Sequence, residues 1–308
     1  MNEIKIFCPA TIANLNCGFD ILGLCLETIG DEMIIRKSTE KGIKITKIVG
    51  ADLPFETKKN VAGVAALAII ENLNLDFGFE IEIYKNIKAG SGIGSSSASA
   101  AGIVFGINEL LGKPFSKEEL VNFAMKGEVV ASGSEHADNV APCLLGGFTL
   151  IRGYEPLDII QIVSPIELFA VVLHPHIEVK TSDARAVIQP TVPLKLAIAQ
   201  TGNLGGFIAG LYTNNYELIS RSLIDVLVEP FRKHLIPNFD KVKNASLQNG
   251  ALGVGISGAG PSIFALCKGK EIAEKVANGM KKSYSSTGIE FDIHISKVNS
   301  KGTEIITN

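Results

Sequence analysis

The sequence of 308 residues is poor in cysteine, and no two cysteines have the CxxC spacing of a metal or redox motif. Five occur, an odd number scattered along the chain: Cys8, Cys17, Cys25, Cys143 and Cys267. This distribution argues against both a disulfide framework and a structural zinc site. A reducing compartment, the cytoplasm, is therefore the predicted location.

An excess of charge of one sign is also missing. The chain has 29 Lys and Arg against 32 Asp and Glu, a formal net charge of −3, with no block of like charges. A sequence-independent hold on nucleic acid or on an anionic membrane therefore has little to act through. Hydrophobic residues make up 46% and charged residues 20%, which excludes a disordered or fibrous protein.

The chain lacks a long hydrophobic run. The first fifteen residues are interrupted by Glu3 and Lys5, so we expect no signal peptide there. A long uncharged stretch, residues 89–108, contains five glycines and five serines and is interpreted as a loop and a buried helix rather than a membrane span.

Length and pattern predict two domains of mixed α+β class, residues 1–158 and 159–308, at roughly 150 residues per domain. Ser116 and Glu119 have the spacing of a capping box that opens a helix running to about residue 130. The other expected strands are 3–8, 21–27, 31–37, 43–49, 79–84, 159–163, 167–173, 252–257, 262–267 and 290–297. The other expected helices are 60–73, 95–111, 182–188, 193–212, 215–227, 239–249 and 270–284, with 9–20 rich in turns.

The strongest local motif is GSGIGSSS at residues 90–97, between an expected strand and an expected helix. Glycines let the backbone approach an oxyanion, the helix N-terminus offers unpaired N–H groups, and the serines add hydroxyl donors. The motif therefore predicts a phosphate cradle, and it is neither a Walker loop nor GxGxxG. The alternative is a flexible Gly/Ser turn.

A second glycine-rich segment, residues 253–262, lies between two short expected strands. Alone it is a structural turn as often as a site, but two such loops, one in each half, favour a ligand between the domains. Between them, Glu128 precedes the polar run 132–139, and a carboxylate near phosphates commonly holds Mg²⁺. The alternative is a solvated loop, and His174 and His176, without a third ligand, do not indicate a metal site.

Three segments resemble the ordered motifs of the GHMP small-molecule kinases: PATIANLNCGFD at 9–20, GSGIGSSSAS at 90–99 and GISGAGPS at 255–262. The similarity spans nearly the whole chain. Residues 134–142 and 229–232 resemble, within that superfamily, the homoserine kinases. The first motif departs from the usual pattern, because Asn16 and Cys17 stand where Gly and Pro are common.

The resemblance implies an α+β fold of two domains, the first with a left-handed βαβ unit and the second ferredoxin-like, with ATP in the cleft between them. It implies Ser96 and Glu128 near Mg²⁺ and Asn139 near the transferring phosphoryl group. The phosphates would lie on Gly90, Ser91, Gly92, Ile93, Gly94, Ser95, Ser96 and Ser97. The amino-acid substrate would lie among Asn14, Asp20, His136, Arg185 and Arg232.

The implied reaction is phosphoryl transfer from ATP to the hydroxyl of L-homoserine, with Glu128, Asn139 and His136 as the catalytic set and a homodimer as the assembly. A zwitterion needs an acid for its ammonium and a cation for its carboxylate, and Asp20 and the two arginines supply them. The alternatives are another GHMP kinase, acting on mevalonate, shikimate or a sugar, and a nucleotide-binding relative without turnover.

Overall fold

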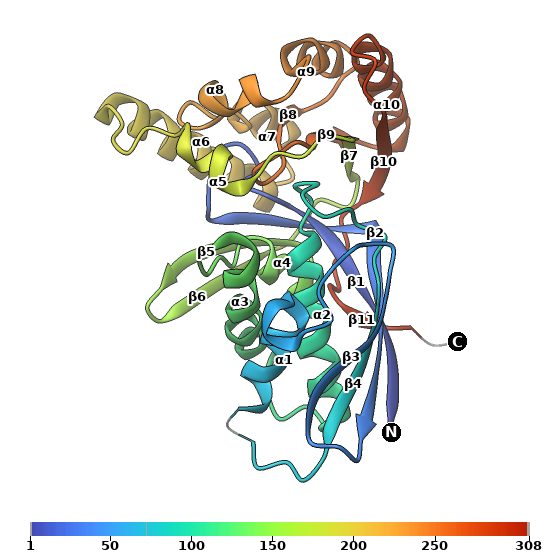
Figure 1. Cartoon of the computed structure of the whole chain (residues 1–308). Helices are drawn as coiled ribbons and strands as arrows, with labels where there is room; N and C mark the ends of the chain where they lie inside the picture. Colours follow the sequence, from blue (N-terminus) through green and yellow to red (C-terminus); the bar gives the residue numbers. More distant parts are fainter. Residues whose placement is uncertain (1, 72, 307–308) are drawn as a thin grey trace.

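The computed structural model describes residues 2–71 and 73–306, which form two β-sheets with helices packed against each (Figure 1). The larger sheet has seven strands, in the order β11-β1-β2-β4-β3, with β5 paired to β2 and β6 to β5. Its pairs are antiparallel except β3 with β4. The strands are β1 (Glu3–Ala13), β2 (Leu22–Ser38), β3 (Gly42–Val49), β4 (Gly78–Tyr84), β5 (Phe148–Tyr154), β6 (Leu157–Ile162) and β11 (Glu304–Ile305).

Helices α1 to α4 pack together against this sheet (Figure 1). The short turn η1 (Thr57–Lys59) and α1 lie in the connection between the parallel strands β3 and β4. The predicted capping box is confirmed, because the Ser116 hydroxyl accepts from the Glu119 amide and the Glu119 carboxylate accepts from the Ser116 amide. The helices are α1 (Val61–Ile70), α2 (Ser95–Leu110), α3 (Lys117–Ser132) and α4 (Val140–Leu145).

The smaller sheet has four antiparallel strands in the order β10-β7-β9-β8. They are β7 (Leu168–Pro175), β8 (Gly253–Ile256), β9 (Ile263–Lys268) and β10 (Phe291–Lys297). Helices α9 (Phe239–Gln248) and α10 (Lys270–Ser285) pack with them around a second apolar core. This order of strands and helices is ferredoxin-like, as predicted. Between β7 and α9 lie α5 (Thr181–Ala186), α6 (Leu194–Tyr212), α7 (Tyr216–Ser222), α8 (Glu229–Arg232) and η2 (Lys233–Leu235).

The chain crosses between the two halves more than once. After β10 the chain returns to the larger sheet, where β11 pairs with β1, and Leu26 forms a β-bridge with Val298. Strand β6 belongs to the larger sheet, although residues 159–163 were expected to begin the second domain. We propose that the division lies after β6 rather than at residue 158. The left hand of the β3-α1-β4 unit stays a prediction.

Three element predictions were wrong in their bounds. Residues 22–38 form one strand instead of two, because β1 pairs with both parts of it, Thr11 opposite Cys25 and Pro9 opposite Gly30. The Phe7 ring packs on Gly30 at the join. Residues 9–13 continue β1 instead of turning. The helix expected over 215–227 ends at Ser222, because the Asp225 carboxylate accepts the amides of the next turn.

None of the helices in the described part of the chain combines the length and the apolar character needed to cross a membrane. The interpretation of residues 89–108 as a loop and a buried helix is confirmed, since α2 begins at Ser95 and most of its residues are buried.

Candidate functional site

The two glycine-rich loops meet in a cleft of about 590 Å³. The cleft is lined by residues 89–92 and 94–96 of the first half and by Gly258, Ala259 and Gly260 of the second. Ser257 Oγ donates to the Gly92 carbonyl at 2.7 Å, and Ser262 Oγ donates to the Ser91 carbonyl at 2.6 Å. The second loop therefore fixes the backbone of the first from the opposite domain.

The first loop has the backbone conformation of an anion cradle. Gly90, Gly92 and Gly94 have φ of 70°, 78° and 73°, and Gly94 is the N-cap of α2. A Cβ on Gly92 would lie 2.5 Å from the Gly260 carbonyl oxygen, so no other residue fits there without moving the second loop. The amino end of a helix of sixteen residues thus opens into the cleft, where its N–H groups and dipole favour phosphate.

Glu128 lies in the cleft beside this loop. Its Oε2 accepts from Ser96 Oγ at 3.2 Å, while its buried Oε1 has no hydrogen-bond partner among the described residues. Burial raises the pKa of the carboxyl to about 7, and the contact with Ser96 opposes the rise. A buried, half-satisfied carboxylate next to a phosphate cradle is suited to a divalent cation.

Asp138, which the sequence analysis did not single out, is a second buried carboxyl in the cleft. Burial and, to a smaller extent, the nearby charges of Asp20 and Glu128 together raise its pKa to about 7. A cation placed beside it would reverse this effect and favour the ionised form. The only signal in the sequence was its place in the polar run 132–139.

Asp20 and Arg185 form a bidentate ion pair at the rim of the cleft. Arg185 Nη1 lies 3.0 Å from Asp20 Oδ2, and Nη2 lies 3.1 Å from Oδ1. His136 adjoins the pair, with Nε2 3.3 Å from Arg185 Nη2 and 2.7 Å from Ser134 Oγ. Burial lowers the pKa of His136, so its neutral form predominates near pH 7.

Arg232 is 3% exposed and forms no ion pair with a carboxylate of the described residues. Its Nε donates to the Ala184 carbonyl at 2.8 Å and its Nη1 to the Gly258 carbonyl at 3.0 Å, while the guanidinium lies 5.0 Å from the centroid of the Phe19 ring. Burial lowers its pKa to about 10, so it remains a cation at neutral pH. An anion in the cleft would supply the missing counter-charge.

Two asparagines that the resemblance named also lie in the cleft. Asn14, with φ of 74°, donates to the Gly258 carbonyl at 2.8 Å and accepts from the Asp20 amide at 3.0 Å, so it holds the loop that carries Asp20 to the second glycine loop. Asn139 Oδ1 accepts from Thr11 Oγ1 at 2.7 Å. This contact leaves the amide nitrogen of Asn139 free to donate into the cleft.

Asn16, which stands where the first motif commonly has glycine, has a left-handed backbone conformation. Its φ is 60°, in the left-handed region that asparagine tolerates better than most residues. Its Nδ2 donates to the carbonyls of Leu223 at 2.8 Å and Val254 at 3.0 Å, so the replacement adds contacts to the second half.

Most of the predicted site residues line the cleft together, and three of them do not. The Ile93 side chain lies in the hydrophobic core, the Ser97 side chain is buried in α2, and Arg185 adjoins the cleft through its contacts with Asp20 and His136. Lys85, which was missed, lines the cleft, forms a buried ion pair with Asp31 and donates to the Ser95 carbonyl at 2.7 Å.

The other end of the cleft is less polar, and it is lined in part by Leu53, Pro54, Val61 and Val130. In residues 2–71 and 73–306 no group of three His, Cys, Asp or Glu has the arrangement of a metal site. His174 instead contacts Ser262 Oγ, and burial lowers its pKa to about 4.

Comparison with known proteins decides the family. Residues 60–147 match the family model described as the GHMP kinases N terminal domain, and residues 204–286 match GHMP kinases C terminal. A homoserine kinase of Chlorobium phaeobacteroides (strain BS1) is 46% identical, over 99% of this chain and 100% of that protein. The chain belongs to the GHMP kinases, and within them to the homoserine kinases.

Solved structures of GHMP kinases agree with this placement. The crystal structure of homoserine kinase from Cytophaga hutchinsonii has a TM-score of 0.96 at 48% identity and covers 99% of this chain and 98% of that one. The L. major mevalonate kinase in complex with R-mevalonate has a TM-score of 0.73 at 15% identity, with 96% of both chains covered, and shows the fold alone. The α+β fold of two domains predicted from the motifs is confirmed.

Proposed function

We propose that the protein transfers the γ-phosphoryl group of ATP to the hydroxyl of L-homoserine, giving O-phospho-L-homoserine for threonine biosynthesis. One observation carries the proposal: a buried guanidinium without a carboxylate partner, Arg232, and a buried carboxyl, Asp138, line the same cleft as a phosphate cradle. An amino-acid zwitterion supplies the counter-charge to both, since its carboxylate suits Arg232 and its ammonium suits Asp138.

The cradle residues fit ATP with Mg²⁺. Glu128 Oε1, Ser91 Oγ and Ser97 Oγ are buried without a hydrogen-bond partner among the described residues. Ser96 and Glu128 would hold Mg²⁺, the loop 90–97 would hold the phosphates, and the less polar end of the cleft would hold the base. When bound, the metal neutralises charge that develops on the phosphate oxygens.

The protein contributes positioning and fixed charge to the transfer. Phosphoryl transfer has a loose transition state, so aligned reactants and preorganised donors supply most of the acceleration. We expect the amide nitrogen of Asn139 to donate to the transferring group. The α2 N-terminus adds positive potential to the loop, and Lys85, paired with Asp31, holds the Ser95 carbonyl behind it. The homoserine hydroxyl attacks the γ-phosphorus in line, ADP leaves, and the hydroxyl proton passes to solvent or to the transferred phosphate.

Another GHMP kinase and a relative without turnover remain the alternatives to test. Mevalonate and shikimate carry a carboxylate but no ammonium, and galactose carries neither, so none of them satisfies Asp138 and Arg232 together. A coupled assay of ADP release with each of these three compounds and with L-homoserine as the substrate distinguishes the three functions. Turnover only with homoserine supports the proposal, turnover with another compound names a different kinase, and ATP binding without turnover indicates the non-catalytic relative.

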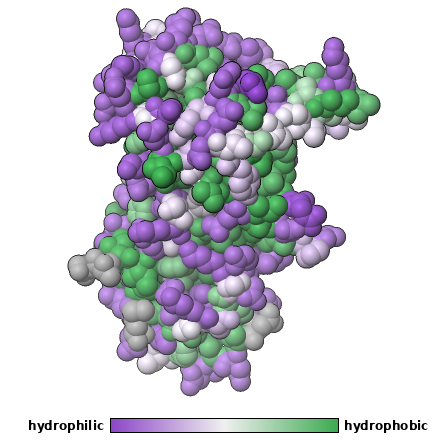
Figure 2. Space-filling view, turned by 180° about the vertical axis from the view of Figure 1, so that it is seen from behind, coloured by the Kyte–Doolittle hydropathy of each residue, from purple (hydrophilic) through white to green (hydrophobic). Residues whose placement is uncertain are grey.

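We propose further that the protein is a cytoplasmic homodimer. Exposed apolar residues support a partner surface: Val192, Leu194, Leu196 and Ile198 lie at the start of α6, and Val163 and Ile166 follow β6. Figure 2 shows hydrophobic side chains on the projecting arm at the upper right, the side on which α6 lies at the upper left of Figure 1. Light scattering of the parent and of Ile198→Glu tests this, with the mass of two chains expected for the parent alone.

A further inference from the structure

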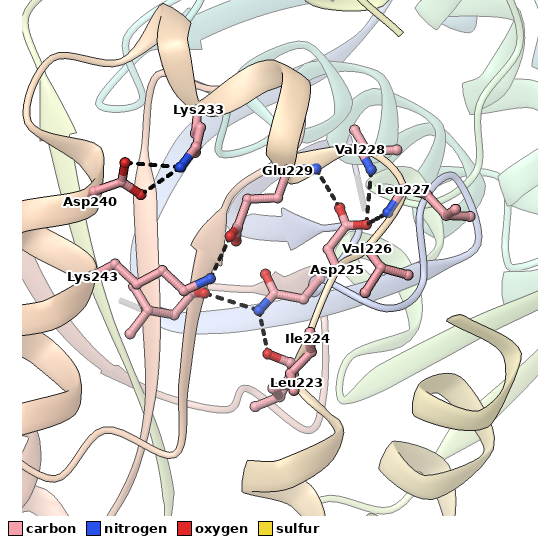
Figure 3. Close-up of polar contacts among 12 residues, drawn as sticks. Leu223, Ile224, Asp225, Val226, Leu227, Val228, Glu229, Lys233, Asp240 and Lys243 are labelled. Atoms are coloured by element: carbon pink, nitrogen blue, oxygen red, sulfur yellow. Dashed lines mark hydrogen bonds and ion pairs between the residues drawn. The ribbon is translucent and has the colours of Figure 1, made fainter. Parts of the chain in front are cut away.

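The single turn α8 places Arg232 in the substrate cleft, and it begins without a side-chain cap of its own. The Asp225 carboxylate instead accepts hydrogen bonds from the backbone N–H groups where α8 begins, as Figure 3 shows. Asp225 Oδ1 accepts from the Leu227 amide at 2.8 Å and from the Val228 amide at 2.9 Å, and Oδ2 accepts from the Glu229 amide at 2.8 Å. A carboxylate on three N–H groups makes strong charge-assisted hydrogen bonds and complements the helix dipole.

A second side chain completes this arrangement. Gln200, 7% exposed on α6, donates from Nε2 to Asp225 Oδ1 at 3.2 Å and accepts from the Val226 amide at 3.0 Å. The same Nε2 lies 3.3 Å from the Asn16 carbonyl oxygen. The loop 225–228 is therefore fixed both to α6 and to the loop that carries Asp20.

The opposite side of α8 is tied to the second domain by ion pairs that face away from the cleft. Glu229 pairs with Lys243, and the Asp240 carboxylate pairs with Lys233 at 2.9 Å (Figure 3). Asp225 and Glu229 both line a small cavity that they share with Arg232, but of the two only Glu229 has a lysine partner among the described residues. The contacts of Asp225 thus fix the backbone from which Arg232 extends, and its negative charge favours the protonated guanidinium.

We propose that Asp225 is the positioning residue that aims Arg232 at the substrate carboxylate, an inference that rests on the proposed function. Asp225 touches neither substrate nor nucleotide in this assignment and acts through the α8 backbone. A shift of about 1 Å in a group that orients substrate costs on the order of 100-fold in rate. The effect should therefore depend on the carboxylate of the substrate and not on ATP.

The test compares Asp225→Asn, Arg232→Ala and the double variant with the parent. The asparagine keeps the shape but turns an amide N–H₂ toward one of the three N–H donors. We expect kcat/KM for L-homoserine to fall about 10- to 100-fold in Asp225→Asn, mainly through KM, while the Kd of ATP from calorimetry is unchanged. Activity toward 3-amino-1-propanol, which lacks the carboxylate, should be low in the parent and change less than twofold. Asp240→Asn, a carboxylate of the same region, is the matched control and should match the parent.

The double variant separates positioning from general stability. If Asp225 acts through Arg232, Asp225→Asn should cost less than about twofold in the Arg232→Ala background. An equal loss for both substrates, or losses that multiply in the double variant, would overturn the inference and leave the proposed function standing. An undiminished Arg232→Ala enzyme would overturn the role of Arg232 and with it this inference, while the proposed function would stand. A parent inactive on homoserine would overturn the proposed function itself.

If Asp225→Asn fails to fold, Gln200→Met provides a second test. It removes the contacts to Asp225 and Val226 and leaves the Asp225 carboxylate in place. Its circular dichroism and ATP affinity should match the parent. Its loss of kcat/KM should be smaller than that of Asp225→Asn and again confined to the substrate with a carboxylate. Equal losses on both substrates would count against the inference.

Discussion

Arg185 holds the Asp20 carboxylate with two hydrogen bonds, while Arg232, in the same substrate region, donates only to the carbonyls of Ala184 and Gly258. The two arginines were assigned the same partner, the substrate carboxylate, from the motifs. Their contacts distinguish them, because Arg185 is already paired with a carboxylate at the rim, whereas Arg232, in the part of the chain that the structure describes, is buried without a carboxylate in contact with it. Arg232 is therefore the stronger candidate for the substrate anion.

The first prediction concerns this difference. Leaving one charge of a desolvated pair unpaired costs about 2–5 kcal/mol, on the order of 30- to several-thousand-fold. Arg232→Ala should lower kcat/KM for homoserine by that range with little change in the Kd of ATP, and Arg185→Ala should cost less. Steady-state kinetics and calorimetry on both variants measure this. Arg232→Lys should recover only part of the loss, because Lys restores the charge but not the two-pronged geometry. A larger loss in Arg185→Ala would reverse the assignment.

The second prediction concerns the half-satisfied carboxylate of Glu128. Glu128→Gln removes the charge proposed to hold Mg²⁺ and should lower kcat by about 100-fold or more while raising the Mg²⁺ concentration needed for half-maximal rate. Circular dichroism should show an intact fold. Glu118→Gln, an exposed carboxylate at the start of the same helix α3, is the control and should match the parent. Normal turnover of Glu128→Gln at ordinary Mg²⁺ would remove Glu128 from the metal site.

The third prediction separates two glycines of the cradle. A Cβ on Gly92 would lie 2.5 Å from the Gly260 carbonyl oxygen, whereas a Cβ on Gly90 would meet only the flexible Glu178 side chain, at 3.3 Å. Gly92→Ala should therefore displace the loop and weaken ATP binding by about tenfold or more. Gly90→Ala should lower only the stability of the fold, by the strain of its left-handed backbone, about 1–2 kcal/mol. Calorimetry with ATP measures both. Gly112→Ala, with φ of 85° and open space around it, is the control for strain alone. Equal ATP affinity in all three would mean that the loop does not hold phosphate.

The parts of the site that the sequence predicted are those carried by local motifs. The cradle at 90–97, the capping box of α3 and Glu128 depend on residues near one another in the chain, so spacing alone indicates them. The Asp20–Arg185 pair joins residues 165 positions apart, and Lys85 meets Asp31 from 54 positions away. A lone lysine after a strand looks like a surface charge in the sequence, and only the packing of β4 against β2 buries it.

Contacts between residues far apart in the chain also explain the errors in the predicted bounds of helices and strands. Gly30 and Asp31 have the composition of a turn, but β2 runs on through them because β1 pairs with both parts of the strand. Asp225 lies in a segment whose apolar spacing continues the pattern of α7, and its side chain ends the regular structure by accepting backbone amides. Both outcomes depend on contacts that the periodicity of a single segment does not contain.

The last prediction concerns pH and the stability of the ligand-free protein. Burial raises the pKa of Glu128 and Asp138 to about 7, from ordinary values of 4.5 and 3.8. Between about pH 4 and 7 the folded state then keeps protons that the unfolded state has released, so each carboxyl stabilises the fold at low pH and loses this contribution as pH rises to about 7. Burial lowers the pKa values of His136, His174 and His294, and these residues contribute with the opposite sign.

Because the two groups of residues oppose each other, the test is the difference between the parent and Glu128→Gln rather than the slope of either. Glutamine resembles the protonated acid at every pH, so the variant should gain stability relative to the parent as pH rises from 5 to 7.5 and show no further gain above it. The difference should be on the order of 3 kcal/mol, since one pKa unit corresponds to about 1.4 kcal/mol. Urea unfolding at pH 5, 6, 7 and 8 without nucleotide or Mg²⁺ measures it, with Glu118→Gln as the control that should track the parent. A constant difference between parent and Glu128→Gln across this range would mean that the carboxyl of Glu128 ionises near its ordinary pKa, and the site would then lack the dry, half-satisfied acid on which the assignment of the metal ligand depends.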